Sequence, residues 1–299
     1  MKIGIGSYAY RWAVQWGRMD ALALLERAHG VGAEVVQICD NLPLDRLSDE
    51  ALDGLARRAA GLGLTLEVGF QGGQPEHLRR GLEVARRLDA RLLRVVLTTP
   101  EWEPSFDEFV AVFKALLPDL RAAGVTVAIE NHFHLPPVEL ARLIQAIGDS
   151  LVGVCLDPLN AVVKLAGPLE TAALLAPFTV SMHAKDAVVT RVQTGFCIAG
   201  CPLGKGLVDI PGVLAAVHAA GRSPNVIVES WMDRLDDEAA TLAQEDDWAR
   251  RGLAYLRHVL PQFTRRLADS PICRFAICYL LFAICYLLIC RFAICPGGS

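Results

Sequence analysis

The sequence predicts an α/β protein in which eight parallel strands, each followed by a helix, close into a (β/α)8 barrel. Short apolar runs of β type alternate with longer segments of helical period, and eight such units can be counted along the 299 residues. This length is typical of a barrel that folds around a single core. We therefore expect one domain over residues 1–268 and a distinct segment over residues 269–299.

The expected strands are short and strongly apolar. They cover residues 2–7, 34–39, 64–69, 91–96, 125–130, 151–157, 178–183 and 225–229. Expected helices cover residues 19–30, 48–63, 75–90, 105–124, 136–148 and 209–221, and a last helix over residues 237–267 closes the ring. Ser48 and Ser105 are the expected N-caps of two helices. Left-handed C-caps are expected at Gly30, Gly63, Gly124, Gly148 and Gly221.

A doubly wound open sheet is the competing architecture. It would need a phosphate-binding loop or a crevice at a switch point between strands. Gly4 and Gly6 lie within the first strand rather than in a turn, and the segment from Gly200 to Lys205 has one residue too few before its Gly-Lys pair. Gly206 also stands where a phosphate loop requires Ser or Thr, so the barrel is favoured.

Composition excludes some classes of partner. The chain has 29 Lys and Arg against 33 Asp and Glu, a formal charge of -4, and neither sign is gathered into a long block, which disfavours nucleic acid. The N-terminus lacks an export signal and already has the pattern of a strand, so we expect a cytoplasmic protein. Cys39, Cys155, Cys197 and Cys201 have no zinc-finger spacing and are interpreted as reduced structural thiols.

The segment 269–299 is apolar, rich in cysteine and consists largely of nearly identical short repeats. Its uncharged part, residues 275–290, falls slightly short of the ~20 apolar residues that a spanning helix needs. We interpret it as a repetitive extension outside the fold and without a function, and keep a membrane anchor as the alternative. Such a segment is also a risk for aggregation.

Four residues of metal-ligand type end four consecutive expected strands: Glu130, Asp157, His183 and Glu229. The carboxyl ends of the strands of a parallel barrel converge on one mouth, so these residues can meet around a single ion. Taken singly, an acidic residue after a strand usually begins a solvated loop, and a lone His is often structural. Four in succession at the same end predict a metal site.

Three carboxylates and one imidazole suit one divalent ion, with Mn²⁺ preferred and Mg²⁺, Co²⁺ or Zn²⁺ as alternatives. Such a site leaves positions for two substrate oxygens, and the ion would acidify a hydrogen beside a carbonyl by stabilising the enediolate. Glu130 and Glu229 are expected on opposite faces of the substrate as a catalytic acid/base pair. The prediction is an isomerase or epimerase of a sugar, a keto-sugar or an inositol-like polyol.

Further polar and aromatic residues are expected at the mouth. Lys185 and His132 stand two residues after a ligand, and strand alternation returns them to the same side. The expected substrate-binding residues are His132, Asn160, Lys185, Arg94, Trp12 and Trp102. Gln37, Asp40 and Asn41 are weaker candidates. The tryptophans could stack on a sugar face, and plain packing is their alternative.

The chain resembles the xylose isomerase-like TIM barrel superfamily, the group of sugar phosphate isomerases/epimerases and AP endonuclease family 2. The resemblance spans residues 1–268 and lies in the motifs AIENH, CLDPLN, HAKD, PLGKGLVDI and VIVES, which contain Glu130, Asp157 with Asn160, His183 to Asp186, Asp209 and Glu229. It implies that the two Glu, the Asp and the His bind the ion, that the two Glu transfer protons, and that a homo-oligomer can form.

Two branches of that superfamily fit less well. Ketose 3-epimerases carry Glu, His and Arg where this chain has Pro136, Asn160 and Val189, so its mode of substrate binding is expected to differ. Endonuclease-like members use extra histidines near positions held here by Gly69 and Val95, which disfavours a nuclease. A metal-dependent lyase or dehydratase acting on a related keto-sugar or polyol is the second hypothesis, and a non-catalytic barrel that binds a sugar or a partner is the third.

Overall fold

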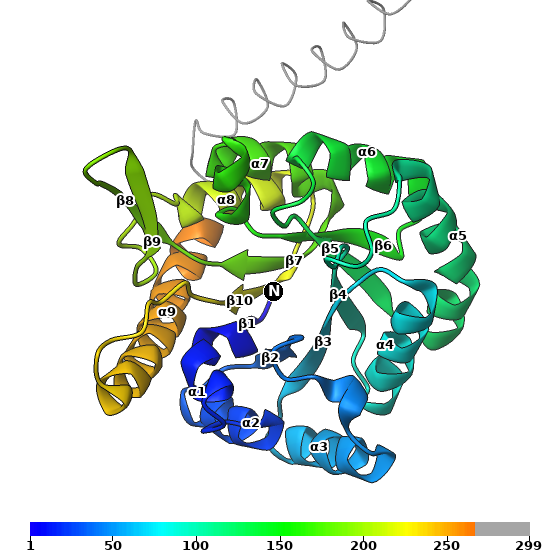
Figure 1. The fold of residues 1–299 in the computed structure, drawn as a ribbon, viewed down its shortest axis with the longest axis horizontal. Coiled ribbons are helices and arrows are strands. Elements are labelled where there is room, and N and C mark those ends of the chain that lie inside the picture. The colour runs from blue at the N-terminus through cyan, green and yellow to red at the C-terminus, as the bar shows by residue number, and fades with distance from the viewer. Residues whose placement is uncertain (267–299) are drawn as a thin grey trace, which may run out of the picture.

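The computed structural model describes residues 1–266, with side chains up to residue 261, and within them eight parallel strands form a closed barrel (Figure 1). The order around the barrel is β1-β10-β7-β6-β5-β4-β3-β2, and every neighbouring pair is parallel. The strands are β1 (Ile3–Gly6), β2 (Val35–Ile38), β3 (Thr65–Gln71), β4 (Leu92–Val96), β5 (Thr126–Glu130), β6 (Val152–Leu156), β7 (Thr179–Ala184) and β10 (Asn225–Val228). The predicted (β/α)8 fold is confirmed.

Helices surround the barrel, as Figure 1 shows. They are α1 (Arg11–Gln15), α2 (Ala21–Gly30), α3 (Asp49–Gly61), α4 (Pro75–Arg87), α5 (Phe106–Ala123), α6 (Pro137–Ile147), α7 (Pro168–Leu175), α8 (Ile210–Ala219) and α9 (Glu238–Arg266). Four short 3-10 helices complete the loops: η1 (Ser7–Tyr10), η2 (Leu44–Arg46), η3 (Asn160–Lys164) and η4 (Ala176–Phe178). A single apolar core lies between this ring and the barrel, since the buried faces of helices and strands form one cluster.

The predicted helix ends are largely confirmed. The Ser48 side chain caps α3, and Ser105 forms a reciprocal capping box at α5. Positive φ angles occur at Gly63, Gly124, Gly148 and Gly221, where left-handed caps were expected. The prediction for Gly30 was wrong: this residue is still helical, and the left-handed residue is Gly32, with φ of 75°.

An antiparallel hairpin inserted after β7 was not predicted. It consists of β8 (Ala187–Arg191) and β9 (Phe196–Gly200), which pair from Ala187 with Gly200 to Arg191 with Phe196. In Figure 1 it projects from the ring of helices beside α9. Much of the hairpin is exposed, including Phe196, so the alternation of buried and exposed residues that identifies a strand is weak here.

The glycine-rich segment after the hairpin folds back on a buried carboxylate. Asp186 accepts hydrogen bonds from the backbone N–H groups of Ala187, Gly204, Gly206 and Val208, at 2.8–3.0 Å. These N–H groups are therefore occupied by a side chain of the protein. This arrangement supports the exclusion of a phosphate loop.

The predicted boundary at residue 268 and the interpretations of the segment 269–299 fall outside the residues that the structure describes, so they stay predictions. No helix within residues 1–266 is both long and apolar enough to cross a membrane. The four cysteines of the barrel are free thiols, as expected, and Cys197 is exposed whereas the other three are buried.

Candidate metal centre and pocket

The barrel brings the four predicted ligands together at one end. Glu130 is the last residue of β5, Asp157 and Glu229 directly follow β6 and β10, and His183 lies near the end of β7. All four are buried, with at most 5% of any residue exposed. The four strands β5, β6, β7 and β10 are neighbours in the barrel, so their carboxyl ends bring these residues into one compact group.

His183 stands at the centre of this group. Its Nδ1 lies 3.7 Å from Glu130 Oε2, 3.6 Å from Asp157 Oδ2 and 3.4 Å from Glu229 Oε2. This buried nitrogen makes no hydrogen bond within the described residues. One nitrogen and three carboxylate oxygens converging on a point are a donor set that fits a divalent cation. Glu130, Asp157, His183 and Glu229 would hold it.

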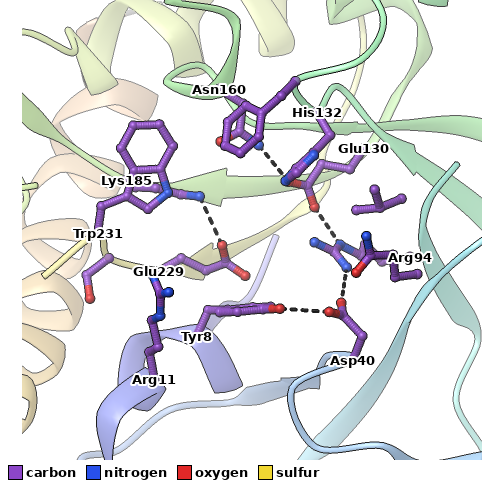
Figure 2. A pocket seen from close by; sticks show the side chains of 14 residues that line it. Tyr8, Arg11, Asp40, Arg94, Glu130, His132, Asn160, Lys185, Glu229 and Trp231 are labelled. Carbon is purple, nitrogen blue, oxygen red and sulfur yellow. Dashed lines mark hydrogen bonds and ion pairs between the residues drawn. The ribbon is translucent and has the colours of Figure 1, made fainter. Parts of the chain in front are cut away.

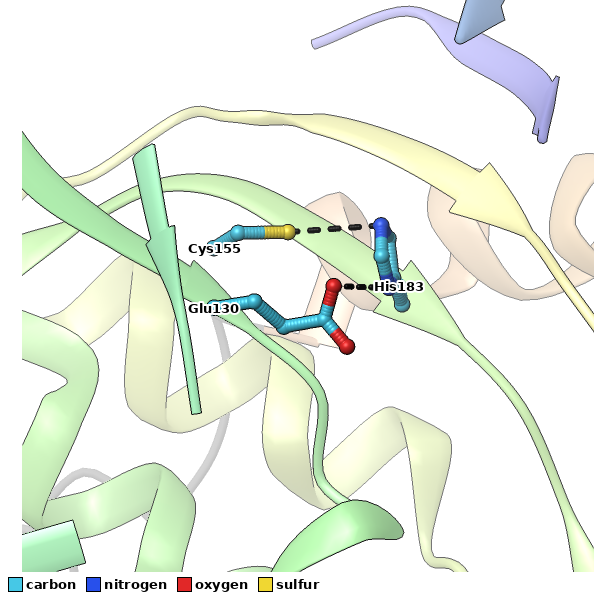
Figure 3. A group of neighbouring side chains, drawn as sticks. All are labelled: Glu130, Cys155 and His183. Atoms are coloured by element: carbon cyan, nitrogen blue, oxygen red, sulfur yellow. Dashed lines mark hydrogen bonds and ion pairs between the residues drawn. The ribbon is translucent and has the colours of Figure 1, made fainter. Parts of the chain in front are cut away.

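A second group that could bind a metal contains Cys155 with Glu130 and His183. Figure 3 shows Cys155 and Glu130 beside the His183 ring, each facing a different ring nitrogen. Cys155 Sγ lies 3.3 Å from Nε2, whereas the three carboxylates face Nδ1. The two nitrogens of one imidazole point in different directions, so the thiol and the three carboxylates do not share one coordination point. The carboxylate-rich side is the better candidate.

Lys185 neutralises part of this negative charge. Its Nζ lies 2.7 Å from Asp157 Oδ2 and 3.2 Å from Glu229 Oε2. Burial alone would lower the pKa of Lys185, but Asp157 and Glu229 outweigh burial and raise it, so the side chain stays an ammonium. Burial would conversely raise the pKa of Asp157, and Lys185 and His183 hold it well below its usual range.

Arg94 performs the same task for Glu130. Its Nε lies 2.5 Å from Glu130 Oε2, and its second contact is to Asp40 Oδ1 at 2.8 Å. The other oxygen of Glu130 accepts a hydrogen bond of 2.7 Å from Asn160 Nδ2. Burial would raise the pKa of Glu130, and Arg94 with His183 lowers it. Both oxygens of this carboxylate are therefore held by donors.

The pKa values of the two histidines near the mouth shift in opposite directions. Burial opposes protonation of His183, but Cys155, Glu229 and Glu130 outweigh it and raise its pKa. Burial lowers the pKa of His132, which is consequently neutral at pH 7.

A pocket of about 200 Å³ opens above these residues (Figure 2). The predicted residues Glu130, His132, Asn160, Lys185, Arg94 and Glu229 line it. Asp157 and His183 lie deeper and are fully buried. Trp12 and Trp102 are not among the lining residues: Trp12 donates to the backbone oxygen of Met232, and Trp102 packs edge-on against Phe109.

Several residues that line the pocket were not predicted from the sequence. Tyr8, Arg11 and Trp231 all reach the pocket. Trp231 stands two residues after Glu229, so the alternation used for Lys185 and His132 could have identified it. Arg11 could not be found this way, because a 3-10 helix separates it from β1 and no strand register applies.

The three positions that depart from the ketose 3-epimerase pattern have local roles. Asn160 binds Glu130, Pro136 is the N-cap of α6, and Val189 lies on the exposed part of the β8–β9 hairpin. Only the first of these residues contacts the candidate centre.

The structure is thus a (β/α)8 barrel with a buried, carboxylate-rich cluster at the carboxyl ends of its strands, which is a candidate centre for a cation. Residues 25–259 match the xylose isomerase-like TIM barrel family, and the chain belongs to this family. It is also similar to 3-oxo-isoapionate decarboxylase from Pectobacterium atrosepticum, with 34% identity over 261 residues that cover 86% of this chain and 95% of the relative.

Solved structures agree with the fold. D-psicose 3-epimerase in the presence of D-fructose has a TM-score of 0.68 at 16% identity, covering 87% of this chain and 99% of the epimerase. IOLI protein with a bound zinc atom has a TM-score of 0.64 at 17% identity, covering 86% of this chain and 98% of the other. At such identities the likeness concerns the fold alone.

Proposed function

We propose that the protein is a divalent-metal-dependent lyase that decarboxylates a 3-oxo sugar acid. The full-length similarity to a decarboxylase of such an acid supports this substrate class. This proposal is the lyase hypothesis derived from the sequence, with carbon dioxide rather than water as the leaving group.

The observation that carries the proposal is the unequal state of the two catalytic candidates. Epimerisation needs a base on one face of the substrate and an acid on the other. Glu130 has both oxygens engaged by Arg94 and Asn160, which disfavours a role in proton abstraction. Decarboxylation needs no base, because the electron pair comes from the broken carbon–carbon bond. A single proton-transfer group then suffices.

The charge of the pocket favours an acidic substrate. Arg94 and Lys185 are already paired with carboxylates of the centre. Arg11, the first residue of α1, lines the pocket and forms no ion pair within the described part of the chain, and Figure 2 shows it pointing towards Glu229. A guanidinium binds a carboxylate through two parallel hydrogen bonds. We assign Arg11 to the carboxylate of the substrate.

The reaction follows from these positions. The bond between the carboxylate and its neighbouring carbon breaks, carbon dioxide leaves, and the electron pair forms an enediolate whose negative charge rests on the former 3-oxo oxygen. A divalent ion held by the four ligands would stabilise this charge as a Lewis acid. The Lys185 ammonium adds positive charge beside it. Glu229 transfers a solvent proton to the carbanionic carbon, and Glu130 acts as a ligand.

The test is product analysis. Protein loaded with Mn²⁺ is incubated with 3-oxo-isoapionate and, separately, with D-fructose, and released carbon dioxide and epimerised sugar are measured. The proposal predicts carbon dioxide from the acid and no turnover of the neutral ketose. An epimerised ketose without any carbon dioxide from the acid would overturn it.

Replacement of Arg11 tests the assigned substrate contact. Arg11→Met should raise KM for the acid about 10- to 100-fold, as expected for one lost charged hydrogen-bonding partner. Arg11→Lys should recover part of the loss. Arg18→Met, which removes an exposed arginine paired with Glu238, is the matched control and should leave KM unchanged. An unchanged KM in Arg11→Met would remove Arg11 from the substrate site.

An isomerase or epimerase of a keto-sugar is the second candidate. It is favoured by the placement of Glu130 and Glu229 on β5 and after β10, each facing the same nitrogen of His183. In that case the two carboxylates form the predicted acid/base pair. Solvent deuterium at an epimerised carbon, observed in the ketose incubation, would identify it.

A further inference from the structure

A chain of hydrogen bonds between buried polar side chains leads to the candidate metal centre, and it starts from residues that are not among the four ligands. Gln37 on β2 and Glu67 on β3 are direct neighbours in the parallel register. Their side chains point into the barrel interior, where 0% and 2% of these residues are exposed. Polar groups in such a core are costly unless they are fully paired, so their hydrogen bonds define a specific arrangement.

The first link of this chain joins Glu67 to Gln37. Gln37 Nε2 donates to Glu67 Oε2 at 2.9 Å, and the other oxygen of Glu67 accepts from Asn225 Nδ2 at 2.8 Å. A carboxylate oxygen facing an amide accepts a hydrogen bond and so selects the NH₂ end of that amide. Glu67 therefore fixes the orientation of the Gln37 side chain.

The second link joins Gln37 to the metal-ligand histidine. With its NH₂ group turned to Glu67, Gln37 presents Oε1 to His183 Nε2 at 2.8 Å. An amide oxygen only accepts, so Nε2 must carry a hydrogen. A divalent ion binds the neutral imidazole, and with hydrogen on Nε2 its lone pair is on Nδ1, the nitrogen that faces the three carboxylate oxygens.

We propose that Glu67 and Gln37 are a positioning relay that holds His183 in the Nε2–H tautomer and thereby prepares Nδ1 to bind a divalent ion. The inference rests on the metal centre used by the proposed function, but not on the reaction. Hydrogen-bond partners of a metal-bound imidazole orient the ring and raise its basicity as a ligand. Glu67 acts here through Gln37, one residue further from the ion than a directly bonded carboxylate.

The test measures metal affinity and tautomer rather than turnover. Glu67→Gln keeps the shape but can offer either end of its amide to Gln37, so the orientation is no longer fixed. The relay predicts that Kd for Mn²⁺, measured by calorimetry, rises about 10- to 100-fold. Histidine ¹⁵N spectra of the metal-free proteins, recorded at a pH where the imidazole of His183 is neutral, should show hydrogen on Nε2 in the wild type and a mixture of the two tautomers in the variant.

Two further variants complete the test. Gln37→Met removes the acceptor without adding charge, and it should weaken Mn²⁺ binding to a similar extent even where Glu67→Gln fails to fold. Asn225→Ala is the matched control, because it removes a donor from Glu67 but leaves the contact between Glu67 and Gln37, and its Kd should equal that of the wild type. Unchanged Kd in Gln37→Met, or hydrogen on Nδ1 in the wild type, would overturn the relay. These measurements do not depend on turnover, so absence of decarboxylase activity would overturn the proposed function without overturning the relay.

Discussion

The two sides of the pocket hold their carboxylates in different ways. On the β4–β5 side, Arg94 and Asn160 occupy both oxygens of Glu130. On the β7–β10 side, Glu229 has the Lys185 ammonium beside it at 3.2 Å. The planar guanidinium of Arg fixes geometry, whereas the Lys ammonium is a point charge on a flexible stem. Two glutamates at comparable strand ends are therefore held differently, which is the basis for proposing that Glu229 alone transfers a proton.

The largest effect should follow from removing Arg94 on the β4–β5 side of the pocket. Arg94→Met leaves Glu130 buried without its cation and should lower the free energy of unfolding by about 3–5 kcal/mol, the usual cost of removing one partner from a buried pair. Urea denaturation measures this loss. Arg121→Met, which breaks an exposed pair with Asp149, is the control and should change stability by about 0–1 kcal/mol. Equal losses in both variants would contradict the importance of the buried pair.

Removal of Lys185 on the β7–β10 side should make the stability of the protein depend more strongly on metal. Lys185→Met removes the cation beside Asp157 and Glu229, and a divalent ion bound by the same carboxylates can replace its charge. The variant should thus unfold at lower temperature without metal, and Mn²⁺ should raise its Tm by more than it raises that of the wild type. A smaller Mn²⁺-induced shift in Lys185→Met would contradict this prediction. Thermal scans with and without Mn²⁺ decide the outcome.

A smaller effect concerns the support of α1, which carries Arg11. Glu245 of α9 accepts hydrogen bonds from the backbone N–H groups of Trp12 and Ala13 at the start of that helix. Burial raises the pKa of Glu245 from 4.5 to about 7, against these bonds and the nearby Arg11. The folded protein therefore binds more protons than the unfolded chain between these values, and stability falls as the pH rises through this window.

The slope from this one group cannot exceed about 1.4 kcal/mol per pH unit. Urea midpoints at pH 5.0 and 7.5 should thus differ more in the wild type than in Glu245→Gln, which cannot ionise. The histidines contribute equally to the pH dependence of both proteins, so their contribution cancels in the comparison. An identical pH dependence of the two proteins would show that Glu245 titrates normally.

The sequence predicted the strands and the four clustered residues at their ends, because both depend on local patterns. The residue that ends an apolar run is visible in the sequence, and barrel topology then places four such residues together. Glu67 shows the limit of this approach. It is a charged residue within an apolar strand, which indicates an unusual environment, but its partners Gln37 and Asn225 come from two other strands.

Partners and orientation were the parts that could not be predicted. Arg94 and Asn160 were expected to bind substrate, yet both contact Glu130 in the structure, because side-chain pairing depends on the register between strands β4, β5 and the loop after β6. Trp12 illustrates the same limit: it lies next to the pocket-lining Arg11, and its indole N–H is bound to Met232. Loop conformation, which decides such orientations, leaves no periodic signal in the sequence.

The most direct test of unequal roles compares Glu229→Gln and Glu130→Gln at saturating Mn²⁺, with carbon dioxide release from a 3-oxo sugar acid as the measured rate. Glu229→Gln should lose about 10²- to 10⁴-fold in kcat, the typical contribution of a proton-transfer group. Glu130→Gln should need more Mn²⁺ but retain a kcat near that of the wild type. Equal losses of kcat in the two variants, or full activity of Glu229→Gln, would contradict the assignment.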